Sequence, residues 1–299
     1  MAIQCSETEY RNFGRCICFE NDTVRLMATL DVGPRIIYFG TRGNKNILFE
    51  DVSRDFCELN KGFGTWYAYG GHRLWTAPEV MPETYYPDNA RVSCSYSDGI
   101  LTLEPKPTPF GKQFQMRIQM SESGKVSIRN SITNISEEPA RFAPWSVTGL
   151  ASGGREFIPL STKQTGFLPN RTLALWSYSA LQDPRFVLTD SYATLQHDPK
   201  AATAFKAGFN VCDGCVVYAA GNQIFKKRFA PYAESVYPDF GCNFETYTNR
   251  HFLECELLGE MREYAPGEKA VIEETWEICE TDQSPEQVIA RLIAEQTKV

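Results

Sequence analysis

The chain has little excess basic charge, no long hydrophobic run and few histidines, and each shortage excludes a class of protein. Its 299 residues hold 30 lysines and arginines against 37 aspartates and glutamates, a net charge of −7. No basic stripe is visible, so we expect no nucleic-acid partner. No apolar stretch approaches the ~20 residues of a membrane span, and residues 1–15 lack a signal-peptide core. We therefore expect a cytoplasmic protein that does not bind membranes.

The ten cysteines follow neither the pattern of a disulfide scaffold nor that of a zinc site. Disulfide-rich domains are usually short and exported. A structural zinc site needs two C-x-x-C pairs or one pair with two nearby histidines, whereas only Cys212 and Cys215 have this spacing and the histidines are dispersed. Asp213-Gly214, between two β-prone runs, predicts a two-residue hairpin turn instead. We therefore assign no metal and no cofactor.

Short β-type segments separated by turns predict an all-β protein. Val126, Ile128 and Ile132 alternate with polar residues, which is typical of a half-buried strand. Turn signals such as Gly33-Pro34 separate neighbouring segments, and helices are largely missing between them. Such spacing favours a β-sandwich or barrel. The clearest segments are 23–32, 35–40, 100–104, 114–120, 125–135, 186–190, 215–221 and 270–278.

One helix is expected, at about residues 284–297. Ser284 and Gln287 form a capping box, with Pro285 at the first helical position. Four apolar residues then follow helical spacing and predict a face that docks on the body of the protein: Val288, Ile289, Leu292 and Ile293. Because no repeat, low-complexity tract or linker is present, we expect residues 1–299 to form a single domain.

Residues 65–89 are the densest functional candidate. Their prolines argue against a helix and they alternate little, so we expect an ordered loop. Aromatic rings stack on the C–H faces of sugars, while arginine, asparagine and aspartate bond hydroxyl groups. A sugar site and a packed loop at the end of a sandwich are equally supported by the residues alone. The candidates in this segment are His72, Arg73, Trp75, Asp88 and Asn89.

A second candidate segment, residues 238–260, carries several polar side chains. Glu245 lies among apolar and amide residues, where partial burial would raise its pKa toward the range of a general base. Glu254 and Glu256 alternate with apolar residues and are interpreted as a solvated strand face. Asn249 lies between these two groups. This segment therefore supplies one candidate base and one candidate hydrogen-bonding residue.

Trp145 lies in a third segment, residues 132–154, directly after Pro144. Its apolar neighbours make it either a core residue or a platform on which a sugar stacks. The core interpretation is the simpler one.

Several motifs resemble the galactose mutarotase-like superfamily. They are GPRIIYFG (33–40), ILFE (47–50), GGHRLWTAPE (70–79), TYYPDN (84–89), ITNISEEPARFAPWSVT (132–148) and PGEKAVIEETWEI (266–278). The GGHRLW-APE motif is similar to the hallmark of one branch, and the ordered matches span about residues 23–278. The resemblance implies a large antiparallel two-sheet supersandwich with a sugar-binding cleft on one concave sheet.

The resemblance also implies a reaction, the interconversion of sugar anomers by ring opening, as in aldose 1-epimerases. This chemistry needs a base for the C1 hydroxyl and an acid for the ring oxygen. Glu245 matches the base in a G-x-x-x-E-T segment, and Arg73 resembles the family's substrate-binding arginine. Trp145-Ser146 stands where the family has the histidine that acts as its general acid, so we assign the role of the acid to His72.

We therefore expect a mutarotase-like enzyme for a small carbohydrate or sugar derivative. Trp75 and Trp145 would form its stacking walls, and Asp88, Asn89 and Asn249 would bind the substrate. Two alternatives remain on the same scaffold. One is a non-catalytic carbohydrate-binding or sensing protein, which the missing histidine favours. The other is a polysaccharide lyase-like activity, which would need a base near C5 and charge neutralisation.

Overall fold

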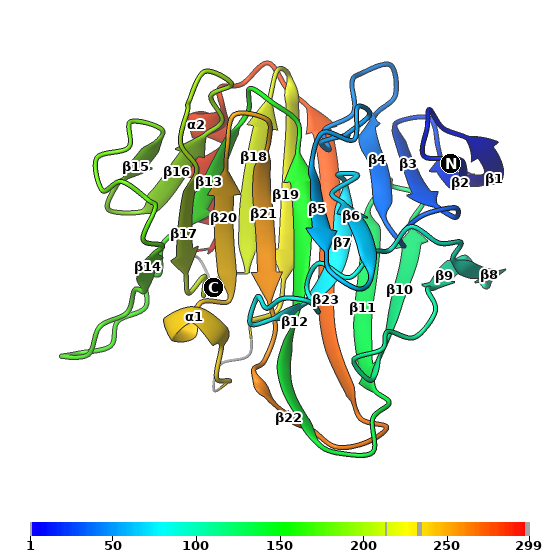
Figure 1. Ribbon diagram of the computed structural model, residues 1–299. Coiled ribbons are helices and arrows are strands. Elements are labelled where there is room, and N and C mark those ends of the chain that lie inside the picture. Colours follow the sequence, from blue (N-terminus) through cyan, green and yellow to red (C-terminus); the bar gives the residue numbers. More distant parts are fainter. Residues whose placement is uncertain (1, 213, 232–234, 297–299) are drawn as a thin grey trace.

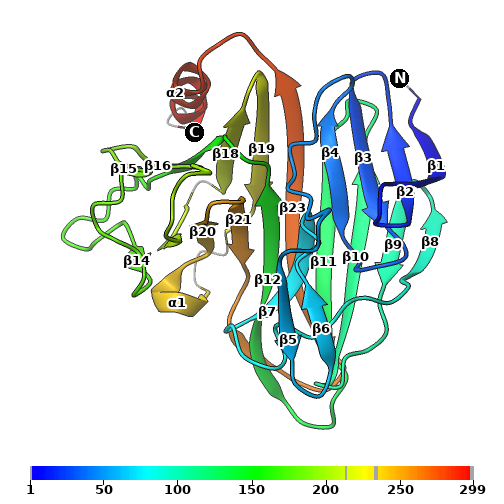
Figure 2. The same ribbon diagram turned by 45° about the horizontal axis from the view of Figure 1, so that its top comes forward.

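The computed structural model describes residues 2–212, 214–231 and 235–296, and it is almost entirely β-structure. Two large antiparallel sheets pack face to face, with a helix against one of them (Figures 1 and 2). This confirms the predicted all-β, two-sheet sandwich with a short C-terminal helix. Among the described residues, no helix combines the length and the apolar character that crossing a lipid bilayer requires.

The first sheet carries the strands that later form the floor of a cleft. In spatial order it consists of β1 (Gln4–Glu9), β2 (Arg15–Glu20), β3 (Val24–Thr29), β4 (Ile36–Thr41), β7 (His72–Ala77), β12 (Ala140–Leu150), β21 (Leu253–Leu258), β20 (Phe244–Thr248), β17 (Phe205–Phe209) and β14 (Leu173–Leu175), with β22 (Arg262–Tyr264) paired to β12.

The second sheet forms the opposite layer. In spatial order it consists of β15 (Phe186–Leu188), β16 (Tyr192–Gln196), β13 (Arg155–Pro159), β18 (Cys215–Ala220), β19 (Gln223–Phe229), β23 (Lys269–Glu280), β11 (Val126–Asn134), β10 (Lys112–Met120), β9 (Ile100–Glu104) and β8 (Ser93–Ser97). A separate hairpin of β5 (Cys57–Asn60) and β6 (Gly64–Tyr67) lies over the outer face of the first sheet (Figure 1).

Alternating side chains build the core between the two sheets. Along β11, Val126 and Ile128 are buried whereas Ser127 and Arg129 are exposed, as the sequence pattern predicts. On β23, Trp276 is fully buried. Its ring packs on Phe39 and Phe225, with centroid distances of 5.4 and 5.2 Å, so it joins both sheets. β12 is different, because it is buried on both of its faces for most of its length.

The C-terminal helix α2 (Pro285–Gln296) confirms the capping-box prediction. The Ser284 amide donates to Gln287 Oε1 at 3.1 Å, and the Gln287 amide donates to Ser284 Oγ at 3.3 Å. Val288 and Ile289 are buried against the outer face of the second sheet, in a cluster that includes Phe157. The side chains from residue 292 onward lie outside the described part of the structure.

The predicted hairpin at Asp213-Gly214 is wrong. Asp213 itself lies outside the described residues, but the strands on either side belong to different sheets: β17 pairs with β14 and β20, and β18 pairs with β13 and β19. A two-residue hairpin requires adjacent strands in one sheet. The carbonyl of Gly214 instead accepts from the amide of Phe229, at the start of the β18–β19 ladder. The segment therefore carries the chain from one sheet to the other.

The predicted loop at residues 65–89 is correct only for its second half. Its first half contains β6 and β7, and β7 lies in the middle of the first sheet. Gly70 and Gly71 precede β7 with φ angles of +93° and +68°. A Cβ atom on either glycine would lie 2.2 Å from a backbone carbonyl oxygen, so only glycine fits there. The two glycines of the GGHRLW motif thus allow the chain before β7 to lie close to the backbone of Phe49 and Ile36.

Candidate functional site

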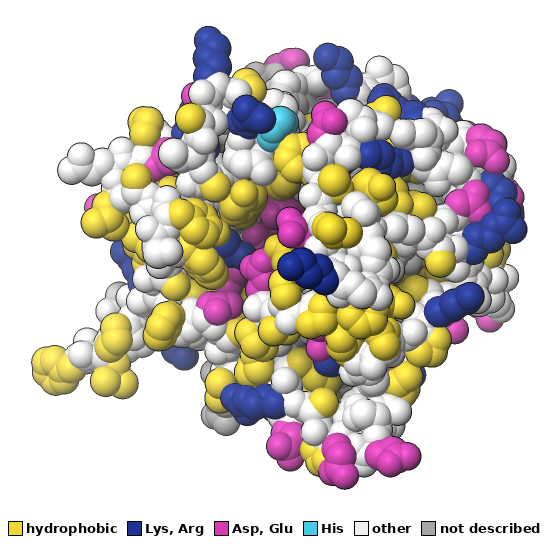
Figure 3. Space-filling model, viewed as in Figure 1, with side chains coloured by type: hydrophobic (Ala, Val, Ile, Leu, Met, Phe, Trp, Pro, Cys, Tyr) yellow, Lys and Arg dark blue, Asp and Glu magenta, His cyan; other side chains and the backbone are white. Residues whose placement is uncertain are grey.

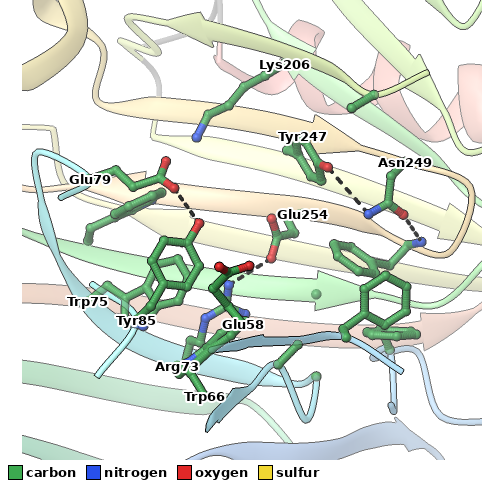
Figure 4. Close-up of a pocket in the computed structure, with 18 of the residues that line it drawn as sticks. Glu58, Trp66, Arg73, Trp75, Glu79, Tyr85, Lys206, Tyr247, Asn249 and Glu254 are labelled. Carbon is green, nitrogen blue, oxygen red and sulfur yellow. Dashed lines mark hydrogen bonds and ion pairs between the residues drawn. The ribbon is translucent and has the colours of Figure 1, made fainter. Parts of the chain in front are cut away.

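A cleft opens over the outer face of the first sheet. Its larger cavity, of about 490 Å³, lies between the sheet and the β5–β6 hairpin, and an adjoining cavity has about 370 Å³. Acidic side chains gather in the hollow (Figure 3), and the close-up shows Glu58, Glu79 and Glu254 among aromatic rings (Figure 4). The residues that line both cavities are Glu79, Tyr85, Trp145 and Lys206.

One buried polar group of the cleft is a lysine held between two glutamates. On paired strands, Glu245 of β20 lies directly opposite Glu256 of β21. Lys206, on β17, places its Nζ 2.7 Å from Glu245 Oε2 and 3.0 Å from Glu256 Oε2. The indole Nε1 of Trp145 donates to Glu256 Oε2 at 2.8 Å. Both glutamates are 1% exposed, so the triad is buried although Glu245 and Lys206 line the smaller cavity.

Burial governs the protonation of this triad. It raises the pKa of Glu245 to about 9. The positive charge of Lys206 lowers this pKa, and the negative charge of Glu256 raises it further. It also raises the pKa of Glu256. Burial alone would lower the pKa of Lys206, but the two carboxylates outweigh it and raise that pKa. Since one ammonium balances one carboxylate, we expect the glutamate pair to share one proton at neutral pH.

Arg73 and Glu254 form a second polar group in the cleft. Arg73 Nη2 donates to Glu254 Oε1 at 3.1 Å, and its guanidinium lies 4.0 Å from the centre of the Trp75 ring. Trp75 in turn packs edge-on against Trp145, with centroids 5.2 Å apart. Arg73 Nε is buried and has no hydrogen-bond partner in the described structure. A donor is therefore available beside the aromatic wall.

Five of the sequence-predicted site residues come together in this cleft. The larger cavity is lined by Arg73, Trp75, Trp145 and Asn249, and the smaller one by Glu245. Trp145 combines the two interpretations that the sequence left open, because it is 4% exposed and still contacts the cleft.

Asp88 and Asn89, which we expected to bind substrate, line neither cavity of the cleft. Asp88 Oδ2 pairs with Nη2 of the fully buried Arg35 at 2.7 Å. Asn89 accepts from the Tyr69 hydroxyl at 2.8 Å and donates to the carbonyl of Thr65 at 2.8 Å. Their contacts instead hold the loop after β7 against the body, so we remove both from the candidate site.

His72, the expected acid, faces away from the cleft. Neighbouring side chains on a strand point to opposite faces, so Arg73 reaches the cleft and His72 enters the space between the sheets. His72 is fully buried, with Nδ1 2.9 Å from Thr148 Oγ1 and Nε2 3.1 Å from Asn130 Nδ2. Nε2 also lies 3.4 Å from Glu274 Oε1, in the second sheet. An acid at this position cannot reach a sugar in the cleft, and we no longer assign that role to His72.

We expect His72 to affect stability in acid instead. Burial lowers its pKa to about 4, with Lys227 and the buried arginines acting in the same direction and Glu274 against it. An unfolded histidine has a pKa of ~6.5, so the contribution of His72 to stability is complete above about pH 6.5 and is lost as the pH falls toward 4. That shift corresponds to about 3 kcal/mol at most.

The test compares wild type with a His72→Asn variant, so that pH effects common to both proteins cancel. Such effects are present, because the raised pKa values of Glu156 and Glu245 favour the folded state as the pH falls over this range. Urea unfolding near pH ~7 and pH ~4.5 should show that the stability advantage of wild type shrinks by about 1–3 kcal/mol in acid. An advantage that is equal at both pH values would contradict the expectation.

Lys206 was not among the residues predicted from the sequence, and Glu256, which was interpreted as solvated, is buried. Lys206 lies between Phe205 and Ala207, two core residues, and this alternation was the available signal that it faces away from the core. Glu79 and Tyr85, which are bonded to each other through the tyrosine hydroxyl, were also missed. Among the described residues, no three histidine, cysteine, aspartate or glutamate side chains gather in a way that could hold a metal ion.

Comparisons with known proteins show a shared fold. No family model matches the chain, and no curated protein matches its sequence. Among solved structures, a galactose mutarotase-like protein from Lactobacillus casei is 11% identical, with a TM-score of 0.57 over 88% of this chain and all of the other. A galactose 1-epimerase from Lactobacillus acidophilus is 10% identical, with a TM-score of 0.50 over 93% and 99%.

A TPR-domain containing protein from Parabacteroides distasonis is also similar, with 12% identity and a TM-score of 0.62 over 90% of this chain. The chain spans only about half of that structure, 48% of its length. Many other structural neighbours are described as galactose mutarotase-like or aldose 1-epimerase proteins. At such identities the likeness establishes the mutarotase-like fold and leaves activity to be argued from the cleft.

Proposed function

We propose that the chain belongs to a mutarotase-like family and that its cleft binds a small carbohydrate and interconverts the anomers. The observation that carries the proposal is the buried Glu245–Lys206–Glu256 triad at the floor of a tryptophan-lined cavity. A carboxyl group whose pKa is raised in this way can hold and release a proton near neutral pH. The fold shared with a galactose 1-epimerase supports the choice of reaction.

Ring opening needs a proton at the ring oxygen and the loss of the proton on the C1 hydroxyl. In our proposal Glu245 holds a proton in the resting cleft and donates it to the ring oxygen while the C1–O5 bond breaks. The C1 hydroxyl loses its proton to a second group, and C1 becomes an aldehyde. After rotation about C1–C2 the same transfers run in reverse. Glu245, which we expected to begin as the base, therefore begins as the acid and acts as the base during closure.

Glu254 is the best placed second group. It lies two residues before Glu256 on β21, and such residues are roughly 6.5 Å apart along a strand. A sugar ring lying along β21 would therefore meet Glu245 at one side and Glu254 at the other. Arg73 holds Glu254 Oε1, and its free Nε would donate to a sugar hydroxyl.

Saturation-transfer NMR on the wild-type protein tests the proposal. Sugars that bind, as judged by quenching of tryptophan fluorescence, should show magnetisation transfer between their α and β anomer signals that the protein accelerates at least tenfold over buffer. Four of the five tryptophans line the cleft, so binding should be visible in their emission: Trp66, Trp75, Trp145 and Trp176. Binding without accelerated exchange would contradict the proposed catalysis.

A non-catalytic carbohydrate-binding protein is the second candidate. Trp145 and Ser146 occupy the positions where the resembled family has its histidine, and no histidine is among the described residues that line the two cavities. This alternative predicts the same fluorescence response with no exchange. A lyase-like activity predicts in addition a growing ultraviolet absorbance from an unsaturated uronate product.

A further inference from the structure

The cleft is longer than one sugar ring. Phe252, Glu254 and Leu258 line it, and they lie on β21 or directly before it at alternate positions, so they face the same side of the sheet. From Phe252 to Leu258 the chain rises about 20 Å, which is three steps of roughly 6.5 Å. The reacting ring of the proposed mechanism covers the one step between Glu254 and Glu256. Length therefore remains on either side of it.

The larger cavity extends beyond Glu254 into a region that we call the aromatic end. Its floor is Gly149 of β12, which lies directly opposite Glu254 in the strand register and therefore on the same face of the sheet. Figure 4 shows Asn249 at this end of the pocket and Glu79 at the other. Three phenylalanine rings complete the lining and pack on one another, with centroids 4.7, 5.3 and 5.8 Å apart: Phe49, Phe56 and Phe252. The aromatic end thus combines an open floor with apolar walls.

Two buried N–H donors beside the same cavity have no hydrogen-bond partner in the part of the chain that the structure describes. They are Nε of Arg73, which comes from the sheet, and Nε1 of Trp66, which comes from the β5–β6 hairpin above it. The two residues are only 6% and 7% exposed. A buried donor without an acceptor is costly, so both call for a ligand that brings acceptor oxygens. A sugar brings several, and its hydroxyl groups would donate in turn to the carboxylates of Glu58 and Glu79, which also line the cavity.

We propose that the aromatic end is a second sugar subsite, and that the cleft prefers the reducing end of a di- or oligosaccharide to a free monosaccharide. This inference rests on the proposed function, because it assumes that a sugar ring reacts beside Glu245, and it names the class of that sugar. The C1 hydroxyl of the reacting ring must stay free for ring opening, so the second ring is joined to it through another carbon atom. The C–H face of the second ring packs on the phenylalanine rings.

Arg73 is placed at the boundary between the two rings. Its Nη2 contacts Glu254 Oε1 at 3.1 Å, and Glu254 separates the step of the reacting ring from the aromatic end. An oxygen near the linkage of a disaccharide would therefore lie beside the unpaired Nε of Arg73. A monosaccharide at the triad would leave the aromatic end filled only by water, which gains nothing from apolar walls.

Fluorescence titrations with matched sugars test the inference. Each reducing disaccharide is compared with the monosaccharide at its reducing end: cellobiose, maltose and lactose with glucose, galactobiose with galactose, and mannobiose with mannose. At least one disaccharide should bind roughly tenfold more tightly than its monosaccharide, which requires about 1.4 kcal/mol from the added contacts. Because these probes are uncharged, the affinity ratio should change little with salt.

A Gly149→Ala variant locates the second ring. A Cβ atom at this glycine would lie 3.5 Å from the Cβ of Phe49, an ordinary contact, and its φ is outside the left-handed region, so the fold accepts alanine. The added methyl group occupies the floor of the aromatic end and should lower the disaccharide-to-monosaccharide affinity ratio several-fold. Ser95→Thr adds a methyl group at an exposed position of β8, outside both cavities, and should keep the wild-type ratio.

Phe56→Leu gives a second test that does not depend on the glycine. It removes one aromatic wall and keeps an apolar side chain at a half-buried position, so the affinity ratio should again fall several-fold. Circular dichroism of both variants checks that the fold is kept. If Gly149→Ala does not fold, Phe56→Leu decides alone. An unchanged ratio in a folded variant would overturn the proposed subsite.

The outcomes separate this inference from the function on which it rests. If no disaccharide binds more tightly than its monosaccharide while anomer exchange is accelerated, the second subsite is wrong and the proposed function stands. Tighter binding of disaccharides without accelerated exchange would support the subsite and contradict the catalysis. If no sugar of any class binds, both the inference and the proposed function fail.

Discussion

A Glu245→Gln variant is expected to lose a factor of about 10²–10⁴ in the rate of anomer exchange, because a positioned proton-transfer group is typically worth that much. The amide keeps the shape of the side chain and its place opposite Glu256, but it can neither hold nor release the proton that ring opening requires. Sugar binding should persist, because the tryptophan walls and Arg73 are untouched.

The chain offers a matched control at Glu156. This glutamate is also fully buried, and burial raises its pKa to about 8, but it lies on β13 and lines neither cavity of the cleft. Glu156→Gln should therefore retain exchange, measured by saturation transfer on the best-binding sugar. If Glu245→Gln exchanges as fast as wild type, the proposed mechanism is wrong. If wild type itself shows no exchange, the binding-protein alternative takes its place.

Local patterns in the sequence predicted those parts of the fold that local chemistry determines. The alternation at Val126 and Ile128 marks a strand with one wet face, and Ser284 with Gln287 marks the start of a helix. β7 left no such signal, because the strand has a polar interior on one side and an aromatic cleft on the other. The hairpin prediction at Asp213-Gly214 failed for a related reason, since partner strands are chosen by the whole sheet.

The candidate site likewise contains residues that local motifs predict and residues that only the pairing of strands brings together. Glu245, Arg73 and Trp75 lie in distinctive motifs, so the sequence alone was enough to propose them. Lys206 and Glu256 are functional candidates only because β17, β20 and β21 lie side by side, which places one lysine between two carboxylates. No spacing within the chain predicts that arrangement, because Lys206 and Glu256 are fifty residues apart.

Lys227 is another residue whose surroundings in the sequence do not predict its position in the structure. The run Lys226-Lys227-Arg228 has the composition of a surface, yet Lys227 is fully buried between the two sheets. Its Nζ lies 3.0 Å from Glu274 Oε2 and donates to Thr148 Oγ1 at 2.6 Å. The pair sits in the interior polar cluster that also contains His72, where charges are costly unless they are matched.

A Lys227→Met variant is therefore expected to lose about 3–5 kcal/mol of the free energy of unfolding. Methionine fills much of the lysine volume, so the loss comes mainly from Glu274, whose carboxylate would remain buried without its cation. Lys227 and His72 now hold the pKa of Glu274 down to about 2 against the opposing effect of burial. Without Lys227 this pKa must rise, so the variant should be less destabilised in acid than at neutral pH.

Urea unfolding of three variants separates the charge effect from packing. Lys226→Met changes the neighbouring, partly exposed lysine and should cost less than about 1 kcal/mol. Adding Glu274→Gln to Lys227→Met removes the unmatched charge, so the double variant should recover a large part of the loss, although Ser146 and Trp276 still need acceptors at that position. Recovery would identify the unpaired carboxylate as the cause. A double variant that is no more stable than Lys227→Met would show that packing around Lys227, and not its charge, stabilises the space between the sheets.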